Sequence, residues 1–152
     1  MSTENGLPVE LHDEINKKKQ EFTMEIVKER CRPNSIHTYC LSQLKSRGYH
    51  IACCSNSIRS TIETMMKKAQ LDTYLEFIVS NQDVTKPKPD PEIYITAMNK
   101  LNLQPDECLI IEDNENGIKA ALASGGHLLA VKNVNEVNWD NISAKIQEIE
   151  SK

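Results

Sequence analysis

The sequence Cys108-Leu109-Ile110-Ile111-Glu112-Asp113-Asn114-Glu115-Asn116-Gly117 joins an apolar run to two neighbouring carboxylates. An apolar run without polar interruption is typical of a strand that is buried on both faces of a parallel sheet. Acidic residues directly after such a strand are favoured by the dipole of a helix that begins there. The stretch therefore predicts a buried strand, a turn and the start of a helix, with Glu112 and Asp113 at the point where the strand ends.

Three further apolar runs, at residues 49–54, 76–80 and 127–131, have the same strand-like composition. Between and around these runs, apolar residues recur at the spacing of a helix face. The helical patterns cover residues 36–44, 58–69, 93–101, 118–122 and 142–149, and a charged helical segment at residues 9–31 precedes them. From residue 36 onward helices and strands alternate, which predicts an α/β fold with a parallel, doubly wound sheet.

The composition is that of one globular domain, with 152 residues of which 39% are hydrophobic and 26% are charged. A net charge of −4 argues against a nucleic-acid partner, because such partners bind basic surfaces. No apolar run reaches the roughly 18 residues of a membrane span, so no membrane partner is expected. The five cysteines lack the C-x-x-C spacing of a metal or redox site, which predicts free thiols in a reducing, cytoplasmic location.

Polar side chains follow each of the first three predicted strands. Ligands of an open parallel sheet bind beyond the carboxyl ends of its strands, so these side chains are candidates for one shared site. Ser55 and Asn56 would offer polar groups to a phosphate, or would only cap the helix that follows them. Lys86 lies in a loop stiffened by prolines and would either neutralise a phosphate or remain solvated. Glu112 and Asp113 would hold Mg²⁺, or would only favour the helix start.

Taken together, three stretches resemble motifs of the haloacid dehalogenase-like superfamily, in its phosphatase and β-phosphoglucomutase-like branch: residues 51–57, 86–91 and 108–117. The resemblance covers about residues 10–140. It implies a Rossmann-like, three-layer αβα core over residues 34–152, preceded at residues 1–33 by the remnant of a helical cap.

The resemblance also implies roles for the candidate residues. Ser55, Asn56 and Lys86 would bind the phosphate of a phosphorylated small molecule. Glu112 and Asp113 would be ligands of a weakly bound Mg²⁺. The activity implied by this site is Mg²⁺-dependent phosphoryl transfer by a phosphatase or phosphomutase.

One motif of the family is missing. That motif is Asp-x-Asp after an apolar strand near the N-terminus, and its two aspartates are the nucleophile and the general acid and base. This sequence contains no Asp-x-Asp. We therefore expect a core that is truncated at its N-terminus, lacks its first strand and is inactive alone. Two alternatives stay open: a split phosphatase completed by another chain, and a non-enzymatic regulatory module that binds phosphate.

The missing strand would lie at the centre of the sheet, between the strands that end at Ser55 and Glu112. Its absence would leave two strand edges, each of which is a template for pairing with another strand. The edges would close on each other, accept residues 7–11, or recruit a second chain or a second copy. Pro8 has no N–H to donate, so residues 7–11 make a poor central strand. We therefore expect closure of the edges or self-association.

Overall fold

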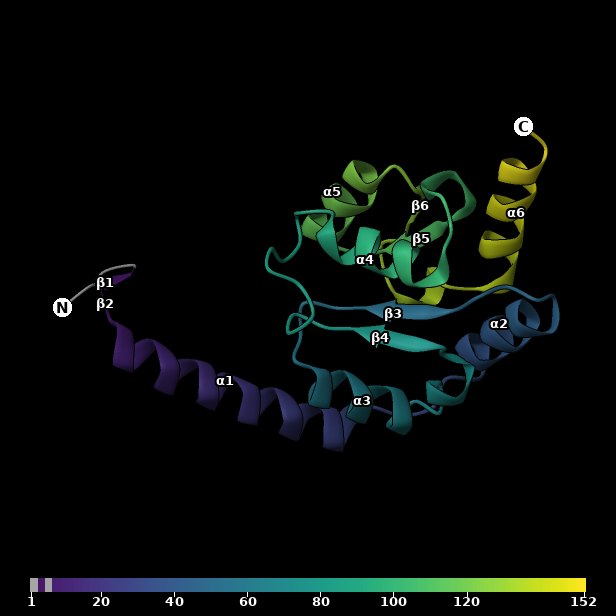
Figure 1. Ribbon diagram of the computed structural model, residues 1–152. Helices are drawn as coiled ribbons and strands as arrows, with labels where there is room; N and C mark the ends of the chain where they lie inside the picture. Colours follow the sequence, from purple (N-terminus) through teal and green to yellow (C-terminus); the bar gives the residue numbers. More distant parts are fainter. Residues whose placement is uncertain (1–2, 5–6) are drawn as a thin grey trace.

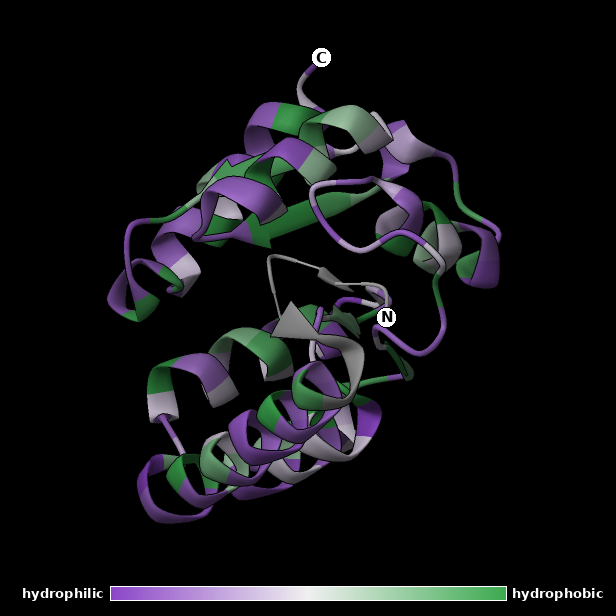
Figure 2. Cartoon of the chain, turned by 90° about the vertical axis from the view of Figure 1, so that its left-hand side faces the viewer, coloured by the Kyte–Doolittle hydropathy of each residue, from purple (hydrophilic) through white to green (hydrophobic). Residues whose placement is uncertain are grey.

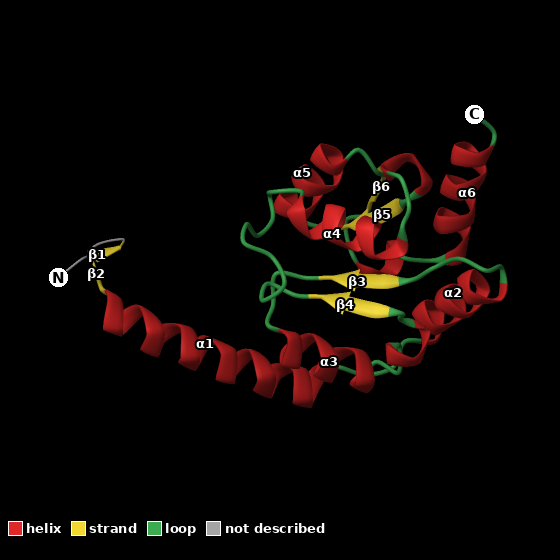
Figure 3. Ribbon diagram, in the orientation of Figure 1, coloured by secondary structure: helices red, strands yellow, loops and turns green. Residues whose placement is uncertain are grey.

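The computed structural model describes residues 3–4 and 7–152, with side chains from residue 11 onward. Its helices are α1 (Val9–Arg30), α2 (Ser35–Ser46), α3 (Arg59–Lys68), α4 (Glu92–Leu101), α5 (Glu115–Ser124) and α6 (Trp139–Glu150). Its strands are β1 (Thr3–Glu4), β2 (Leu7–Pro8), β3 (Ala52–Cys54), β4 (Phe77–Val79), β5 (Leu109–Glu112) and β6 (His127–Ala130) (Figures 1 and 3). Short 3₁₀ helices span Asp72–Tyr74, Pro105–Glu107 and Val134–Glu136.

The α/β class predicted from the sequence is confirmed, since each predicted strand and helix is present. β3 pairs with β4 and β5 pairs with β6, both in parallel. Figure 2 shows hydrophobic residues on the strands and many hydrophilic residues on the surrounding helices. The helix ends also agree with the sequence signals: α5 is followed by its C-cap residue Gly125, whose φ of +83° is a left-handed conformation that favours glycine.

The edge of β3 that faces away from β4 can be deduced from the hydrogen bonds between these two strands. The Ser55 N–H donates to the Val79 carbonyl oxygen over 3.0 Å, and Ser55 therefore directs its backbone toward β4. In a parallel pair alternate residues direct their backbone groups to opposite sides. Ala52 and Cys54 therefore direct their N–H and C=O groups away from β4.

The edge of β5 that faces away from β6 follows in the same way. The Val131 N–H donates to the Glu112 carbonyl oxygen over 2.9 Å, and the His127 N–H donates to the Cys108 carbonyl oxygen over 2.8 Å. Leu109 and Ile111 alternate with these residues, so their backbone groups are directed away from β6.

The expectation that these two edges close on each other is wrong. Among the described residues, β3–β4 and β5–β6 form separate two-stranded sheets without a ladder between β3 and β5. β2 does not fill the gap either, because it pairs antiparallel with β1 beyond the N-terminal end of α1 (Figure 1). Lateral closure would require the helices that cover both half-sheets to move together, and their packing opposes this.

Helices, rather than backbone hydrogen bonds, join the two half-sheets. α4 contacts β3 and β4 and also packs against α5, which in turn contacts β5 and β6. α2 packs against α6, which contacts β6. The central hydrophobic cluster extends across both halves and consists of Val79, Ile93, Tyr94, Ala97, Met98, Ile110, Ala120 and Ala121. The fold is therefore one packed unit with a divided sheet.

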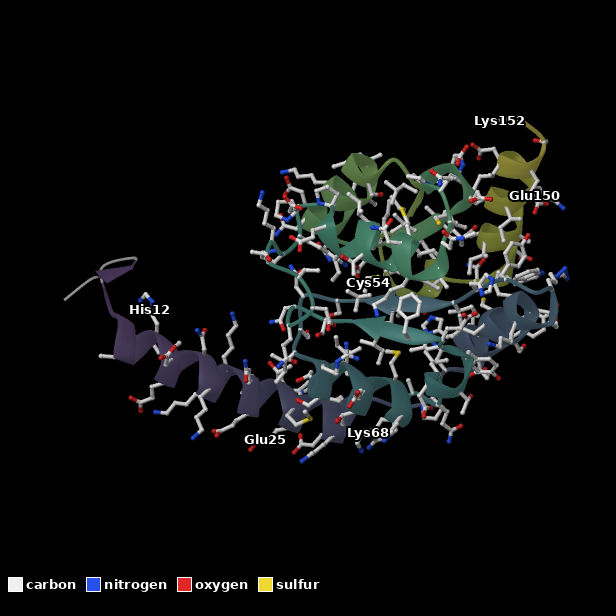
Figure 4. All side chains as sticks on the ribbon, viewed as in Figure 1. His12, Glu25, Cys54, Lys68, Glu150 and Lys152 are labelled. Carbon is white, nitrogen blue, oxygen red and sulfur yellow. The ribbon has the colours of Figure 1, made fainter. Side chains whose placement is uncertain are left out.

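Helix α1 is a single helix that projects from this unit (Figure 1). Its C-terminal end packs on α3, where Val27 is buried and the Lys68 ammonium donates to the Lys28 carbonyl oxygen over 3.0 Å (Figure 4). Further toward its N-terminus, apolar side chains are exposed, among them Ile15 and Phe22. No helix among the described residues has the length and apolarity that crossing a membrane requires.

The central cluster is expected to carry much of the stability. Replacing Ile93, which is 0% exposed, by alanine should lower the free energy of unfolding by about 2–5 kcal/mol, because a cavity remains where the side chain was. Urea denaturation followed by circular dichroism measures this change. The matched control is Ile95→Ala on the same helix, where the side chain is 41% exposed and the change should stay within about 0.5 kcal/mol. Equal losses in the two variants would contradict the assignment of the core.

Candidate functional site

A polar cleft of about 410 Å³ lies at the carboxyl ends of β3 and β5, on the two sides of the gap. The loop after β3 supplies one wall, the loop after β5 and the start of α5 supply the other, and one lysine enters from the loop before α4. The lining residues are Cys54, Ser55, Asn56, Ser57, Lys88, Ile111, Glu112, Asp113, Asn114 and Asn116. Of the candidate residues predicted from the sequence, Ser55, Asn56, Glu112 and Asp113 are brought together here.

The cleft contains a buried ion pair. The side chains of Lys88 and Glu112 are each only 8% exposed, and the Lys88 ammonium donates to Glu112 Oε1. The same ammonium donates to the Cys54 carbonyl oxygen over 3.0 Å. It also lies 4.9 Å from the centre of the Tyr94 ring, at a distance typical of a cation–π contact. The Tyr94 hydroxyl donates to Glu112 Oε1, so two donors share one carboxylate oxygen.

Tyr94 is held in its neutral form by these surroundings. Burial raises the pKa of its phenol, and the hydrogen bond to Glu112 and the negative charge of that carboxylate raise the pKa further. The phenol therefore remains a hydrogen-bond donor throughout the physiological pH range.

Lys86, the lysine predicted from the sequence to bind phosphate, does not line the cleft. Its side chain is exposed, and its backbone N–H donates to the Glu92 carboxylate over 2.8 Å. Lys88 lies in the cleft instead. The sequence contains two consecutive Lys-Pro pairs, and only the second is spaced from Tyr94 so that both side chains reach Glu112. This shared partner is distant along the chain, so no local sequence signal could have distinguished Lys88 from Lys86.

Asn56 contacts the backbone of Lys88. Its amide nitrogen donates to the Lys88 carbonyl oxygen over 3.3 Å, and its amide oxygen accepts from the Lys88 N–H over 3.1 Å. Both ends of the amide are thus engaged, and Asn56 positions the lysine loop.

Ser55 is half-buried, and its hydroxyl oxygen accepts from the Ser57 N–H over 3.2 Å. The helix that follows begins only at Arg59, and its N-cap residue, Ile58, makes no side-chain cap. The alternative that Ser55 caps this helix is therefore wrong. Within the described part of the chain the Ser55 hydroxyl donates to no protein acceptor, so its proton is available to a ligand.

Asp113 is exposed at the other wall of the cleft. Its carboxylate accepts a long hydrogen bond of 3.5 Å from the Asn114 side chain, which also donates to Glu112 Oε2 over 3.4 Å. The Asn114 side-chain oxygen accepts from the Gly117 N–H over 2.8 Å and so caps α5. Asn114 and Asn116 line the cleft, so the N-terminal end of α5, the end of a helix that favours anions, lies beside it.

The residues present do not form a Mg²⁺ site by themselves. Both oxygens of Glu112 already accept hydrogen bonds, and its charge is compensated by the ammonium of Lys88. Mg²⁺ requires near-octahedral coordination by oxygen, and Asp113 is then the one carboxylate of the pair without a buried cation beside it. Within the described part of the chain, no group of three or more His, Cys, Asp or Glu side chains is arranged to hold a metal ion.

Burial favours the neutral thiol form of the cysteines near the cleft. Burial raises the pKa of Cys54 to about 12, with a further contribution from Cys53, and burial likewise raises the pKa of Cys53. Figure 4 labels Cys54 between β3 and α4. All five cysteines are free. Because a thiolate is the nucleophilic form, neither residue is suited to covalent catalysis.

An α/β core with parallel strands and a polar cleft at their carboxyl ends defines a protein of the Rossmann-like class. The chain belongs to the haloacid dehalogenase-like hydrolase family, whose model matches residues 3–131.

One relative is similar in sequence, and two solved structures are similar in fold. The chain is 29% identical over 115 residues to phosphoglycolate phosphatase from Nitrosospira multiformis, covering 71% of this chain and 51% of that protein. Its fold is similar to that of β-phosphoglucomutase from Clostridium difficile, with a TM-score of 0.74 and 22% identity over 95% of this chain and 69% of that one. It is also similar to that of CbbY from Rhodobacter sphaeroides in complex with xylulose-(1,5)bisphosphate, with a TM-score of 0.73 and 20% identity over 92% and 63% of the two chains. The chain spans about half the length of the phosphoglycolate phosphatase that it matches.

Gly117 permits the close approach of α5 to the ion pair. A Cβ atom at this position would collide with the carboxylate of Glu112. Alanine is a better helix former than glycine by about 1 kcal/mol, so an unhindered Gly→Ala change would stabilise the helix. We expect Gly117→Ala instead to lower the free energy of unfolding by about 1–3 kcal/mol, because the carboxylate must move.

Urea denaturation measures this effect, with Asn116→Ala as the control. Asn116 is the exposed neighbour in the same helix turn, and its replacement should change stability by less than about 0.5 kcal/mol. A stabilised Gly117→Ala variant would show that the approach of Glu112 is not constrained.

Proposed function

We propose that this chain is the phosphate-binding part of a phosphatase or phosphomutase of the haloacid dehalogenase-like family, acting on a phosphorylated small molecule. The observation that carries the proposal is the cleft at the carboxyl ends of β3 and β5, where Ser55, Lys88 and the start of α5 converge. The named activities of the relatives support the substrate class, since one is a phosphoglycolate phosphatase and another holds a sugar bisphosphate.

The proposed division of labour follows from the chemistry of each group. Lys88 supplies positive charge close to the phosphate, and the Ser55 hydroxyl donates a hydrogen bond to a phosphate oxygen. The N-terminus of α5 adds backbone donors and the positive end of its dipole. Phosphatases of this family are generally Mg²⁺-dependent, and a bound Mg²⁺ would supply charge neutralisation; here Asp113 is the side chain available to hold it.

We assign residues 34–152 to the core and residues 1–33 to the cap, since α1 ends at Arg30 and α2 begins at Ser35. We also assign the protein to a reducing, cytoplasmic location, because its cysteines are free thiols.

The 152-residue chain alone is expected to have no phosphatase activity. Its sequence has no Asp-x-Asp, and no thiolate of low pKa is present beside the cleft to replace the aspartyl nucleophile. Hydrolysis of an aryl phosphate in the presence of Mg²⁺ should therefore proceed at the background rate. Turnover that co-purifies with the protein and is lost in Asp113→Ala would contradict this expectation.

Phosphate binding is expected to depend on Lys88 and not on Lys86. We expect Lys88→Met and Ser55→Ala each to weaken the binding of inorganic phosphate by about tenfold, which corresponds to one lost charge-assisted or hydroxyl hydrogen bond of roughly 1.4 kcal/mol. Lys86→Met is the matched control, because this lysine is exposed outside the cleft. Phosphorus NMR titration measures the affinities. An effect of Lys86→Met equal to that of Lys88→Met would refute the assignment.

A second candidate function, a half-enzyme completed by another chain, is favoured by the two strand edges. Ala52 and Cys54 on one side and Leu109 and Ile111 on the other direct backbone groups into the gap, as two neighbours of a central strand would. A single parallel strand from a partner would pair with both edges. A regulatory module would instead bind phosphate without ever acquiring turnover.

Light scattering after size exclusion tests whether a second copy occupies the gap. If the edges pair between copies, the wild-type chain should be a dimer and Leu109→Lys should be a monomer, because a charge on a strand edge opposes pairing. Leu122→Lys is the control, since Leu122 is 63% exposed on α5 and belongs to neither strand edge. A wild-type chain that is monomeric at all concentrations would exclude self-association.

A further inference from the structure

We infer that Lys88 is the resident counter-ion of Glu112 and keeps this carboxylate from binding a metal ion, with Tyr94 as a positioning residue for the pair. The inference deepens the proposed function, because it concerns the same cleft. It predicts that Glu112 of this chain is not a metal ligand while Lys88 is in place, and that Mg²⁺ and the lysine ammonium compete for one carboxylate.

The Lys88 ammonium is held on several sides by groups of the protein. The ammonium donates to Glu112 Oε1 and to the Cys54 carbonyl oxygen, and the Tyr94 ring lies 4.9 Å away on a further side. The side chain is 8% exposed, so little water is available to replace these partners. An ammonium with three donors that is bonded in this way is held in one place, in contrast to a lysine that extends into solvent.

Besides Glu112, the Lys88 ammonium also satisfies the Cys54 carbonyl oxygen, an acceptor that a metal ion bound to Glu112 would leave unpaired. It lies on the edge of β3 that faces the gap, where the ladder to β4 does not reach it. A buried carbonyl without a partner costs about 1–3 kcal/mol, so the lysine satisfies the backbone and the carboxylate together. Displacing the lysine would deprive both the Cys54 carbonyl oxygen and Glu112 Oε1 of the ammonium donor.

Both carboxylate oxygens of Glu112 are already engaged by hydrogen-bond donors. Tyr94 and Lys88 donate to Oε1, and Asn114 donates to Oε2 over 3.4 Å. Gly117 lies so close that a side chain there would collide with the carboxylate. A divalent cation that approached Glu112 would therefore meet a positive ammonium at close range, and their repulsion in a buried site is strong. Mg²⁺ can reach Asp113, which is exposed, but binding through one carboxylate is weak.

The decisive experiment is a Mg²⁺ titration of Lys88→Met followed by calorimetry. Methionine keeps the length and most of the volume of the lysine and removes its charge, which leaves Glu112 buried without a counter-ion. We expect Lys88→Met to bind Mg²⁺ at least about tenfold more tightly than the wild-type chain, and Mg²⁺ to raise its melting temperature more than that of the wild type. Lys86→Met, the matched control, should bind Mg²⁺ as the wild type does.

A double variant tests whether the gained affinity belongs to Glu112. In Lys88→Met/Glu112→Gln, the amide needs no counter-ion, and the gain in Mg²⁺ affinity should disappear. Wild-type affinity in the micromolar range, or no gain in folded Lys88→Met, would overturn the inference.

If Lys88→Met does not fold, a measurement on the wild-type chain still tests the inference. A buried and hydrogen-bonded ammonium should give a slowly exchanging ¹⁵N-lysine resonance that persists as Mg²⁺ is added. Loss of that resonance at low Mg²⁺ concentration would overturn the inference. Titration of the wild-type chain with inorganic phosphate, without Mg²⁺, reports separately on the proposed function, so failure of one does not imply failure of the other.

Discussion

One buried ion pair, between Lys88 and Glu112, bridges the two half-sheets at the point where the sheet is divided, and the cleft is built around it. The strands β3 and β5 share no ladder in the described chain, and the packing of helices holds the two half-sheets side by side. The ion pair adds a polar connection across the gap, since the same ammonium is bonded to the β3 edge and to the last residue of β5. Removing one partner of such a pair is costly, because the other charge then remains buried alone.

The polar cleft is a consequence of the same topology. Parallel strands end at one edge of a sheet, and the loops that follow them gather there with the polar residues that the strands exclude. Asn56 and Glu92 hold the lysine loop through backbone N–H groups, and Asn114 caps the helix that begins opposite. Three loops from distant parts of the sequence thus form one site, although the strands at its base are not paired with each other.

Prediction from the sequence was most successful where the signal was local. The run Leu109–Glu112 is a strand because it has no polar interruption, and α5 begins directly after it because Asn114 is a good N-cap. Ser55, Asn56, Glu112 and Asp113 were found because each follows a strand. Lys86 was assigned as the phosphate-binding lysine from the resemblance of residues 86–91 to a family motif. Both Lys86 and Lys88 precede a proline, so the sequence offers no local feature that distinguishes them.

By itself, the sequence determined the order of helices and strands, the α/β class and the set of polar residues at the strand ends, because these follow from periodicity and from residues adjacent along the chain. The absence of Asp-x-Asp is likewise a property of the sequence alone. Only the tertiary structure decided which lysine enters the cleft, that Glu112 is neutralised by it, and that the two edges remain apart. Each of these depends on contacts between residues that are distant in the sequence, and on how helices of fixed volume pack on either side of the gap.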